Sequence, residues 1–273
     1  MRPEHELRRD IVTICRRLSE RGYIAATDGN VSVRVAGPGG APRVLITPSG
    51  LHKGFIKDDD IVLCDMKGSL IRGKRQPSSE ILMHLKAYEL RADIGAVVHA
   101  HPPLSTAFTI AKVSLARCVL PEVVLTMGTI PTTAYATPSS PEGPEVIKDL
   151  IADHDALVLD RHGTLTVGRD VFDAYGKLEK IEHTAQVTLA ARMLGRLTTL
   201  DAAQLARLEH LSPERVRRAA ADPACLGCGG CQPEGRLTNG CSCAGETAPE
   251  AEREADRKAI ARLVAEELKA ALG

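Results

Sequence analysis

The segment Ala96–Pro103 constrains the fold of this chain most, because it combines a strand signal, a histidine pair and a helix start. Valines enter the segment, His99 and His101 occupy alternate positions, and a Pro-Pro pair ends it. A β-branched run favours a strand, and proline suits the first turn of a following helix. In a strand, the two histidines would point to the same face. Two imidazoles on one face can bind a divalent metal ion, or they can be ordinary polar side chains at a sheet edge.

Further elements follow from periodicity and turn residues. Apolar residues recur at helical spacing from Leu7 to Leu18, and Gly22 is expected to end that helix. Helices are also expected at 77–91, where Ser78 or Ser79 would be the cap, from Pro103, at 141–153 and at 171–194, with smaller helices to about 221. Strands are expected at 31–35, 44–46, 61–65, 97–101 and 156–160, and strand-like segments at 121–125 and 130–135.

Composition excludes several classes of protein. The chain of 273 residues has 35 basic and 35 acidic residues, so no positive excess favours a nucleic acid or an anionic membrane as partner. No apolar run approaches the roughly 20 residues that span a bilayer, and the charged start is unlike a secretory signal. We therefore expect a cytoplasmic protein, in which thiols stay reduced.

Four turns contain the small and amide residues that suit a phosphate group. Backbone N–H groups and hydroxyls can converge on an oxyanion in such turns, and a helix start favours negative charge. The turns are Gly29-Asn30, Ser49-Gly50, Ser78-Ser79 and His162-Gly163. Each could be only a turn, but together with the histidine pair and Glu80 they predict a site.

The motifs resemble, in the same order, those of the class II aldolase/adducin family, and most closely its sugar-phosphate aldolases of the L-fuculose-phosphate aldolase type. The resemblance extends from Leu7 to about Leu194. The matching motifs are Gly29-Asn30-Val31-Ser32, Thr47-Pro48-Ser49-Gly50, Pro77-Ser78-Ser79-Glu80, His99-Ala100-His101, Tyr135-Ala136-Thr137 and His162-Gly163. The resemblance implies an α/β fold of three layers, with a central, mostly antiparallel sheet flanked by helices. It also implies a cyclic homotetramer with active sites between subunits.

The resemblance also implies roles for individual residues. His99, His101 and His162 match three zinc ligands. Glu80 matches a carboxylate that can ligate the metal when no substrate is bound and that serves as the catalytic base. The positions that match phosphate binding are Gly29, Asn30, Ser49, Gly50, Ser78 and Ser79. Three histidines leave open positions on zinc, where a phosphorylated ketose can place its oxygens and the metal can act as a Lewis acid. The remaining histidines match no ligand and are expected at the surface or in packing: His5, His52, His84, His154, His183 and His210.

One position departs from the family. L-fuculose-phosphate aldolases protonate the departing aldehyde oxygen with a tyrosine from a neighbouring subunit, and Leu120 stands at that position here. Glu122 is the nearest group with an exchangeable proton, so it is either the replacement acid or a surface or intersubunit charge. The departure leaves L-fuculose 1-phosphate, rhamnulose phosphate and 5-deoxyribulose phosphate open as substrates. The alternatives to an aldolase are an epimerase or dehydratase on the same zinc scaffold, or a non-catalytic adducin-like protein.

The composition changes after the catalytic domain, which we expect at 1–221. Residues 222–250 are rich in Gly, Pro and Glu and contain the cysteines Cys225, Cys228, Cys231, Cys241 and Cys243. Their spacing suits zinc or an iron–sulfur centre, or the segment is a flexible linker. Residues 251–273 have apolar residues at helical spacing. A linker followed by such a helix resembles the encapsulation peptides of bacterial microcompartment cargo, so the helix would bind a shell protein in the microcompartment lumen, or pack on its own tetramer.

Overall fold

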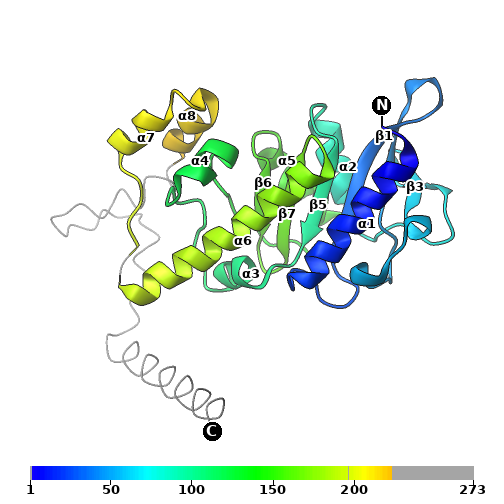
Figure 1. The fold of residues 1–273 in the computed structure, drawn as a ribbon, viewed down its shortest axis with the longest axis horizontal. Helices are drawn as coiled ribbons and strands as arrows, with labels where there is room; N and C mark the ends of the chain where they lie inside the picture. Colours follow the sequence, from blue (N-terminus) through cyan, green and yellow to red (C-terminus); the bar gives the residue numbers. More distant parts are fainter. Residues whose placement is uncertain (1, 196, 223–273) are drawn as a thin grey trace, which may run out of the picture. The chain divides into compact units, whose positions relative to one another are not determined.

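The computed structural model describes residues 2–195 and 197–222 (Figure 1). Its centre is a seven-stranded sheet in the order β4-β3-β2-β1-β5-β7-β6, and neighbouring strands all pair antiparallel. The strands are β1 Asn30–Ala36, β2 Pro42–Ile46, β3 Val62–Cys64, β4 Leu70–Arg72, β5 Ala96–Ala100, β6 Ala156–Leu159 and β7 Gly163–Gly168. The expected cysteine cluster and C-terminal helix lie outside the described residues.

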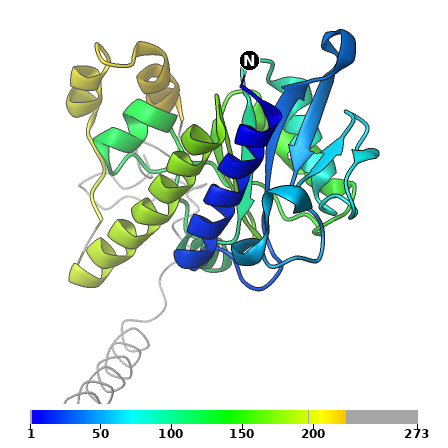
Figure 2. The same ribbon diagram turned by 45° about the vertical axis from the view of Figure 1, so that its right-hand side comes forward.

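Helices cover both faces of this sheet. They are α1 Glu4–Glu20, α2 Ile81–Leu90, α3 Pro103–Ile110, α4 Pro121–Met127, α5 Glu142–Ile151, α6 Val171–Leu194, α7 Ala202–Leu208 and α8 Pro213–Ala221. Short 3-10 turns occur at Pro38–Gly40, Lys53–Phe55 and Asp58–Asp60. Helices α1 and α6 lie over one face, and α2 and α5 lie over the other (Figures 1 and 2). The predicted three-layer α/β architecture, with its antiparallel sheet, is confirmed.

Strand β5 shows how the two faces divide the core. Val98 joins the cluster under α1 and α6, whereas Val97 joins the cluster under α2 and α5. Because side chains alternate along a strand, His99 points to the same side as Val97, toward α2. Strand β1, expected to be half-buried, is instead buried on both faces from Asn30 to Val33, since helices cover both.

Several sequence predictions need correction. The segment 121–125 is not strand-like but belongs to α4, because Pro121 begins the helix while Val123 and Val124 are buried by helical packing. The segment 130–135 contributes only an isolated bridge between Thr132 and Val158. Helix α2 starts at Ile81 rather than near residue 77. Strands β4 and β7 were not anticipated.

Other predictions are confirmed at nearly the expected bounds. Helix α6 spans the predicted 171–194, and α5 lies within the predicted 141–153. Over the residues that the structure describes, no helix has both the length and the apolar character needed to cross a bilayer.

Candidate metal centre and pocket

Four side chains from separate elements meet at one end of the central strands. They are Glu80, His99, His101 and His162, and one potential ligand atom from each lies within 4.8 Å of the others. Glu80 is the N-terminal cap residue of α2, His99 is in β5, His101 follows β5, and His162 lies in the turn between β6 and β7. The structure thus brings together all four residues predicted at the metal site.

Close backbone approaches place the histidines. A Cβ atom on Gly163 would lie 2.3 Å from the Ala100 carbonyl oxygen and 2.8 Å from Cδ2 of His101. Gly29 has a φ of +69°, and a Cβ there would lie 3.0 Å from the carbonyl oxygen of His99. Glycine at these two positions allows β7 and the loop before β1 to approach both histidines.

The nitrogen atoms of the rings face a common centre. Nε2 of His99 lies 3.1 Å from Oε2 of Glu80, and Nε2 of His162 lies 3.3 Å from Oε1 of the same carboxylate. Nε2 of His101 lies 2.9 Å from Nε2 of His99. The three ring centroids are 4.7 to 4.8 Å apart.

Partners outside the cluster orient two of the rings. Nδ1 of His99 lies 2.8 Å from the carbonyl oxygen of Thr164, which can only accept, so Nδ1 carries the proton. Nδ1 of His101 lies 3.5 Å from a carboxylate oxygen of Asp28. These contacts leave the Nε2 lone pairs toward the centre, which is the arrangement metal-binding histidines require. The donor set therefore fits a divalent transition-metal ion.

Electrostatics make Glu80 the negative partner of His99. Burial by itself would raise the pKa of Glu80, but the charge and hydrogen bond of His99, the charge of His162 and the amide of Asn30 together hold it well below its usual range. Burial likewise opposes the His99 cation, yet the carboxylate of Glu80 raises the pKa of that ring. Burial and the charge of His99 lower the pKa of His101 to about 3 and that of His162 to about 4. Two of the three rings are thus neutral near pH 7, the form that binds metal.

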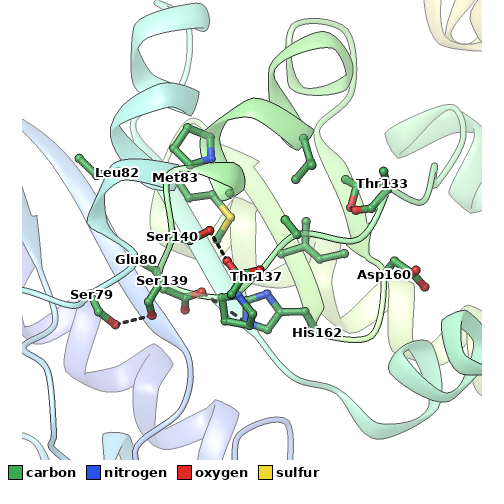
Figure 3. A pocket seen from close by; sticks show the side chains of 17 residues that line it. Ser79, Glu80, Leu82, Met83, Thr133, Thr137, Ser139, Ser140, Asp160 and His162 are labelled. Atoms are coloured by element: carbon green, nitrogen blue, oxygen red, sulfur yellow. Dashed lines mark hydrogen bonds and ion pairs between the residues drawn. The ribbon is translucent and has the colours of Figure 1, made fainter.

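A pocket opens beside Glu80 and His162 (Figure 3). The loop of residues 137–140 forms its wall with polar side chains, and Met83 and Leu82 of α2 add apolar ones. The Ser79 hydroxyl lies 2.8 Å from that of Ser139 in this loop. A small polar ligand reaching Glu80 would therefore meet hydroxyl groups on one side.

The predicted phosphate turns lie near one another, and their sequence neighbours hold them together. The backbone N–H of Ser49 donates to Gln76 (3.0 Å) and that of Ser78 donates to Thr47 (3.1 Å). Buried Lys53 donates from Nζ to the carbonyl oxygens of Thr27 and Leu51. Sequence reasoning did not identify this lysine, which links the two glycine-containing turns Gly29-Asn30 and Ser49-Gly50.

The other predicted positions differ in their surroundings. Ser49, Gly50 and Ser79 are exposed, whereas Ser78 and Gly29 are buried. Ser78 does not cap α2 through the expected contact with the helix; its hydroxyl accepts from the N–H of Glu80 at 3.3 Å. Asn30 is buried, and its amide is bonded to Glu80 and to the ring of His84.

Glu122 is exposed in the first turn of α4 and is not part of the histidine cluster. The role predicted for it stays a prediction. His84 was expected at the surface or in packing, but it lies one side chain away from Glu80, through Asn30. Its position four residues after Glu80, on the same face of a helix, was the available signal.

The fold and the site define the class of this protein. It is a layered α/β protein with a cluster of histidines and a carboxylate at the ends of its strands. Residues 9–189 match the family described as Class II Aldolase and Adducin N-terminal domain, and the chain belongs to the class II aldolase/adducin family.

Curated relatives carry two activities in their names. An L-fuculose phosphate aldolase of Methanococcus maripaludis is 37% identical over 178 residues, which cover 65% of this chain and 93% of that protein. A 3-oxo-tetronate 4-phosphate decarboxylase of Haemophilus influenzae is 30% identical over 201 residues, covering 71% of this chain and 93% of that protein. The named relatives are lyases.

Solved structures share the fold. An L-fuculose 1-phosphate aldolase superposes with a TM-score of 0.68 at 27% identity, covering 77% of this chain and 95% of that one. A sugar-phosphate aldolase from Thermotoga maritima superposes with a TM-score of 0.64 at 25% identity, covering 71% of this chain and 98% of that one.

Proposed function

We propose that this protein is a zinc-dependent class II aldolase that cleaves a ketose 1-phosphate to dihydroxyacetone phosphate and an aldehyde. The observation that carries the proposal is the convergence of three imidazoles on one centre, with a partly buried carboxylate beside them. L-fuculose 1-phosphate or a related deoxyketose phosphate is the substrate class, in keeping with the aldolases among the relatives.

His99, His101 and His162 would hold the zinc ion, leaving room for substrate oxygens. When bound, zinc supplies a Lewis acid that stabilises the negative charge developing on those oxygens as the carbon–carbon bond breaks. The outer contacts of His99 with Thr164 and of His101 with Asp28 keep the rings oriented before any substrate arrives.

Glu80 would transfer the proton at the reacting carbon. In the condensation direction its carboxylate accepts the proton that dihydroxyacetone phosphate gives up. In cleavage the same group returns that proton to the same carbon, as microscopic reversibility requires. The phosphate turns would bind the remote end of the substrate and orient the reacting end over Glu80.

A second candidate is decarboxylation of a phosphorylated 3-oxo acid. The Haemophilus influenzae relative and relatives from Escherichia coli carry this activity in their names, at 30% identity. Loss of carbon dioxide leaves negative charge beside a carbonyl group, as aldol cleavage does, so the same site would stabilise both reactions. The products distinguish them.

The deciding experiment combines a substrate panel with metal analysis. Purified protein is incubated with ketose 1-phosphates and with phosphorylated 3-oxo acids, while dihydroxyacetone phosphate and carbon dioxide are measured. We expect dihydroxyacetone phosphate from a ketose phosphate, and zinc that co-purifies with the protein. Carbon dioxide from a 3-oxo acid alone would favour the second candidate, and no zinc binding would reject both.

Two variants connect the metal to the histidine cluster. His99→Ala should lose zinc and at least a thousandfold in turnover, because a buried ligand is removed. His183→Ala is the matched control, since His183 is exposed on α6. It should keep both zinc and turnover.

A further inference from the structure

A continuous chain of buried side chains leads away from Glu80 into the protein. Nδ2 of Asn30 donates to Oε2 of Glu80 at 2.9 Å, and Oδ1 of the same amide contacts Nε2 of His84. Nδ1 of His84 lies 2.7 Å from Oγ of Ser32, which in turn lies 2.9 Å from the Tyr88 oxygen. Asn30, Ser32, His84 and Tyr88 are all buried, with His84 and Ser32 fully so.

From this chain we infer that His84 is a positioning residue that acts through Asn30 to hold the carboxylate of Glu80 in its productive orientation. The consequence for turnover rests on the proposed function, but the orientation itself does not. Asn30 alone is insufficient to orient the carboxylate of Glu80. An amide can rotate to present either its oxygen or its nitrogen, and a carboxylate accepts only from the nitrogen.

The chemistry of the partners fixes the direction of every hydrogen bond. Ionised Glu80 only accepts, so the NH₂ group of Asn30 must face it and the amide oxygen must face His84. Nε2 of His84 must then carry the proton. Since burial and the charge of His99 lower the pKa of His84 to about 3, the ring is neutral and its Nδ1 accepts a hydrogen bond.

The far end of the chain satisfies that acceptor. The Ser32 hydroxyl donates to Nδ1 of His84, and its oxygen accepts from the Tyr88 hydroxyl. Only one placement of the hydrogen atoms along this chain of side chains therefore gives every donor an acceptor. A different tautomer of His84 would turn the Asn30 amide and set its oxygen against the carboxylate, which costs free energy in a buried site.

The spacing of these residues connects helix α2 to strand β1. Glu80, His84 and Tyr88 recur every four residues, on one face of α2. Asn30 and Ser32 recur every two residues, on one face of β1. The helix start that carries Glu80 is thereby fastened to the strand next to β5, which carries His99.

The contacts of Glu80 show when this positioning matters. In the described part of the chain, its carboxylate contacts His99, His162 and Asn30. The first two are candidate metal ligands. An Nε2 atom that binds a metal carries no proton, so it cannot at the same time donate a hydrogen bond to Glu80. Asn30 then remains as the side-chain donor that sets the carboxylate orientation.

Substitutions at position 84 separate positioning from packing. His84→Gln keeps an N–H donor for Asn30, whereas His84→Met has similar volume but no donor. We expect His84→Met to lower kcat at least tenfold with KM and zinc content within threefold of wild type, and His84→Gln to restore kcat to within threefold. Thr166→Val is the control, because it deletes another buried hydroxyl, which donates to the carbonyl oxygens of Ala174 on α6 and Val98 on β5 and has no hydrogen bond to Glu80, Asn30 or His84.

A second variant covers the case in which His84→Met fails to fold. Asn30→Ala deletes the amide and leaves the ring in place, and it should lower kcat as much as His84→Met. Because His84 acts through Asn30, His84→Gln and, where it folds, His84→Met should cost nothing further in the Asn30→Ala background. Additive losses in kcat, or full turnover in Asn30→Ala, would overturn the inference.

Crystal structures of the metal-free variants test the orientation without any assay. The Asn30 nitrogen should stay within hydrogen-bond distance of Glu80 in His84→Gln and Thr166→Val, and should leave it in His84→Met. An unmoved amide in His84→Met would refute the positioning role even if the protein has no aldolase activity. Absence of aldolase activity with a displaced amide would instead reject the proposed function and leave the positioning intact.

Discussion

The four residues of the cluster share charge in a way that suits metal binding. His99 is the ring whose pKa is raised, because it faces Glu80, whereas the pKa values of His101 and His162 are lowered. When His99 is protonated in the metal-free site, its charge and that of the Glu80 carboxylate neutralise each other. A divalent ion would replace that proton with a larger charge while using the same carboxylate and rings.

Glu122 offers a prediction at the scale of one residue. If it exchanges a proton with the aldehyde oxygen in a neighbouring subunit, taking that proton from the substrate hydroxyl in cleavage and returning it in condensation, Glu122→Gln should lower kcat about a hundredfold or more. Zinc content and melting temperature should stay unchanged, because the side chain is exposed and lies outside the metal cluster. Steady-state kinetics, metal analysis and thermal unfolding measure these three quantities.

The chain contains a matched control for this variant. Pro213-Glu214 begins α8 as Pro121-Glu122 begins α4, so Glu214→Gln removes an equivalent helix-start charge. It should keep full turnover. Full turnover in Glu122→Gln as well would show that Glu122 is only a surface charge.

The sequence was most informative about residues that belong to motifs. His99, His101, His162 and Glu80 could be predicted together, because each lies in a short motif that resembles one of the class II aldolase/adducin family. The spacing of His84 from Glu80 indicates only a shared helix face. Its role could not be predicted, because its partners Ser32 and Asn30 are about fifty positions away and only the packing of α2 on β1 brings them near. The role of such a residue depends on tertiary contacts.

At the scale of elements, the site depends on how closely β7 approaches the end of β5. Gly163 starts β7, and its missing side chain leaves room for Ala100 and His101. Gly163→Ala should push the two strands apart, destabilise the protein by about 1–3 kcal/mol and weaken zinc binding at least tenfold. Denaturant unfolding and competition with a zinc chelator measure the two effects.

A second glycine provides the comparison. A Cβ atom on Gly176, within α6, would meet no atom within 4 Å. Gly176→Ala should therefore stabilise the protein by up to about 1 kcal/mol through helix propensity, and should leave zinc affinity unchanged. If Gly163→Ala bound zinc as tightly as Gly176→Ala, the close approach would not be needed for the site.

The elements that the sequence mispredicted share a physical cause. In α4 the β-branched residues Val123 and Val124 favour a strand locally, but burial against α6, α7 and α8 favours a helix. Strand β7 alternates threonine with apolar residues, and helices cover both faces of the sheet, so its threonines are buried rather than exposed. Long helices such as α6 were predicted well, since a repeated apolar pattern needs no knowledge of its partners.

At the scale of the folded chain, buried neutral histidines make stability depend on pH. Burial is the main cause that lowers the pKa of His84 and His101 to about 3 and that of His162 to about 4. In the unfolded chain a histidine has a pKa of about 6.5. Below that pH the unfolded state takes up protons that the folded state does not, so the three rings destabilise the fold as pH falls.

The groups with opposite behaviour do not cancel this effect. The raised pKa of His99 stabilises the fold below about pH 6.5 and loses its effect as pH rises through the folded value. The lowered pKa of Glu80 stabilises the fold above about pH 4.3, so it contributes equally at pH 7 and pH 5. Three destabilising rings therefore oppose one stabilising ring between these pH values.

We accordingly expect the metal-free protein to be less stable at pH 5 than at pH 7, with His84 alone accounting for about 2 kcal/mol. Chemical unfolding after chelation measures the difference. His84→Gln cannot take up a proton at this position, so its unfolding free energy should fall by about 2 kcal/mol less between the two pH values. Equal losses in both proteins would mean that His84 takes up a proton between pH 7 and pH 5 as readily in the fold as in the unfolded chain, which would contradict its lowered pKa.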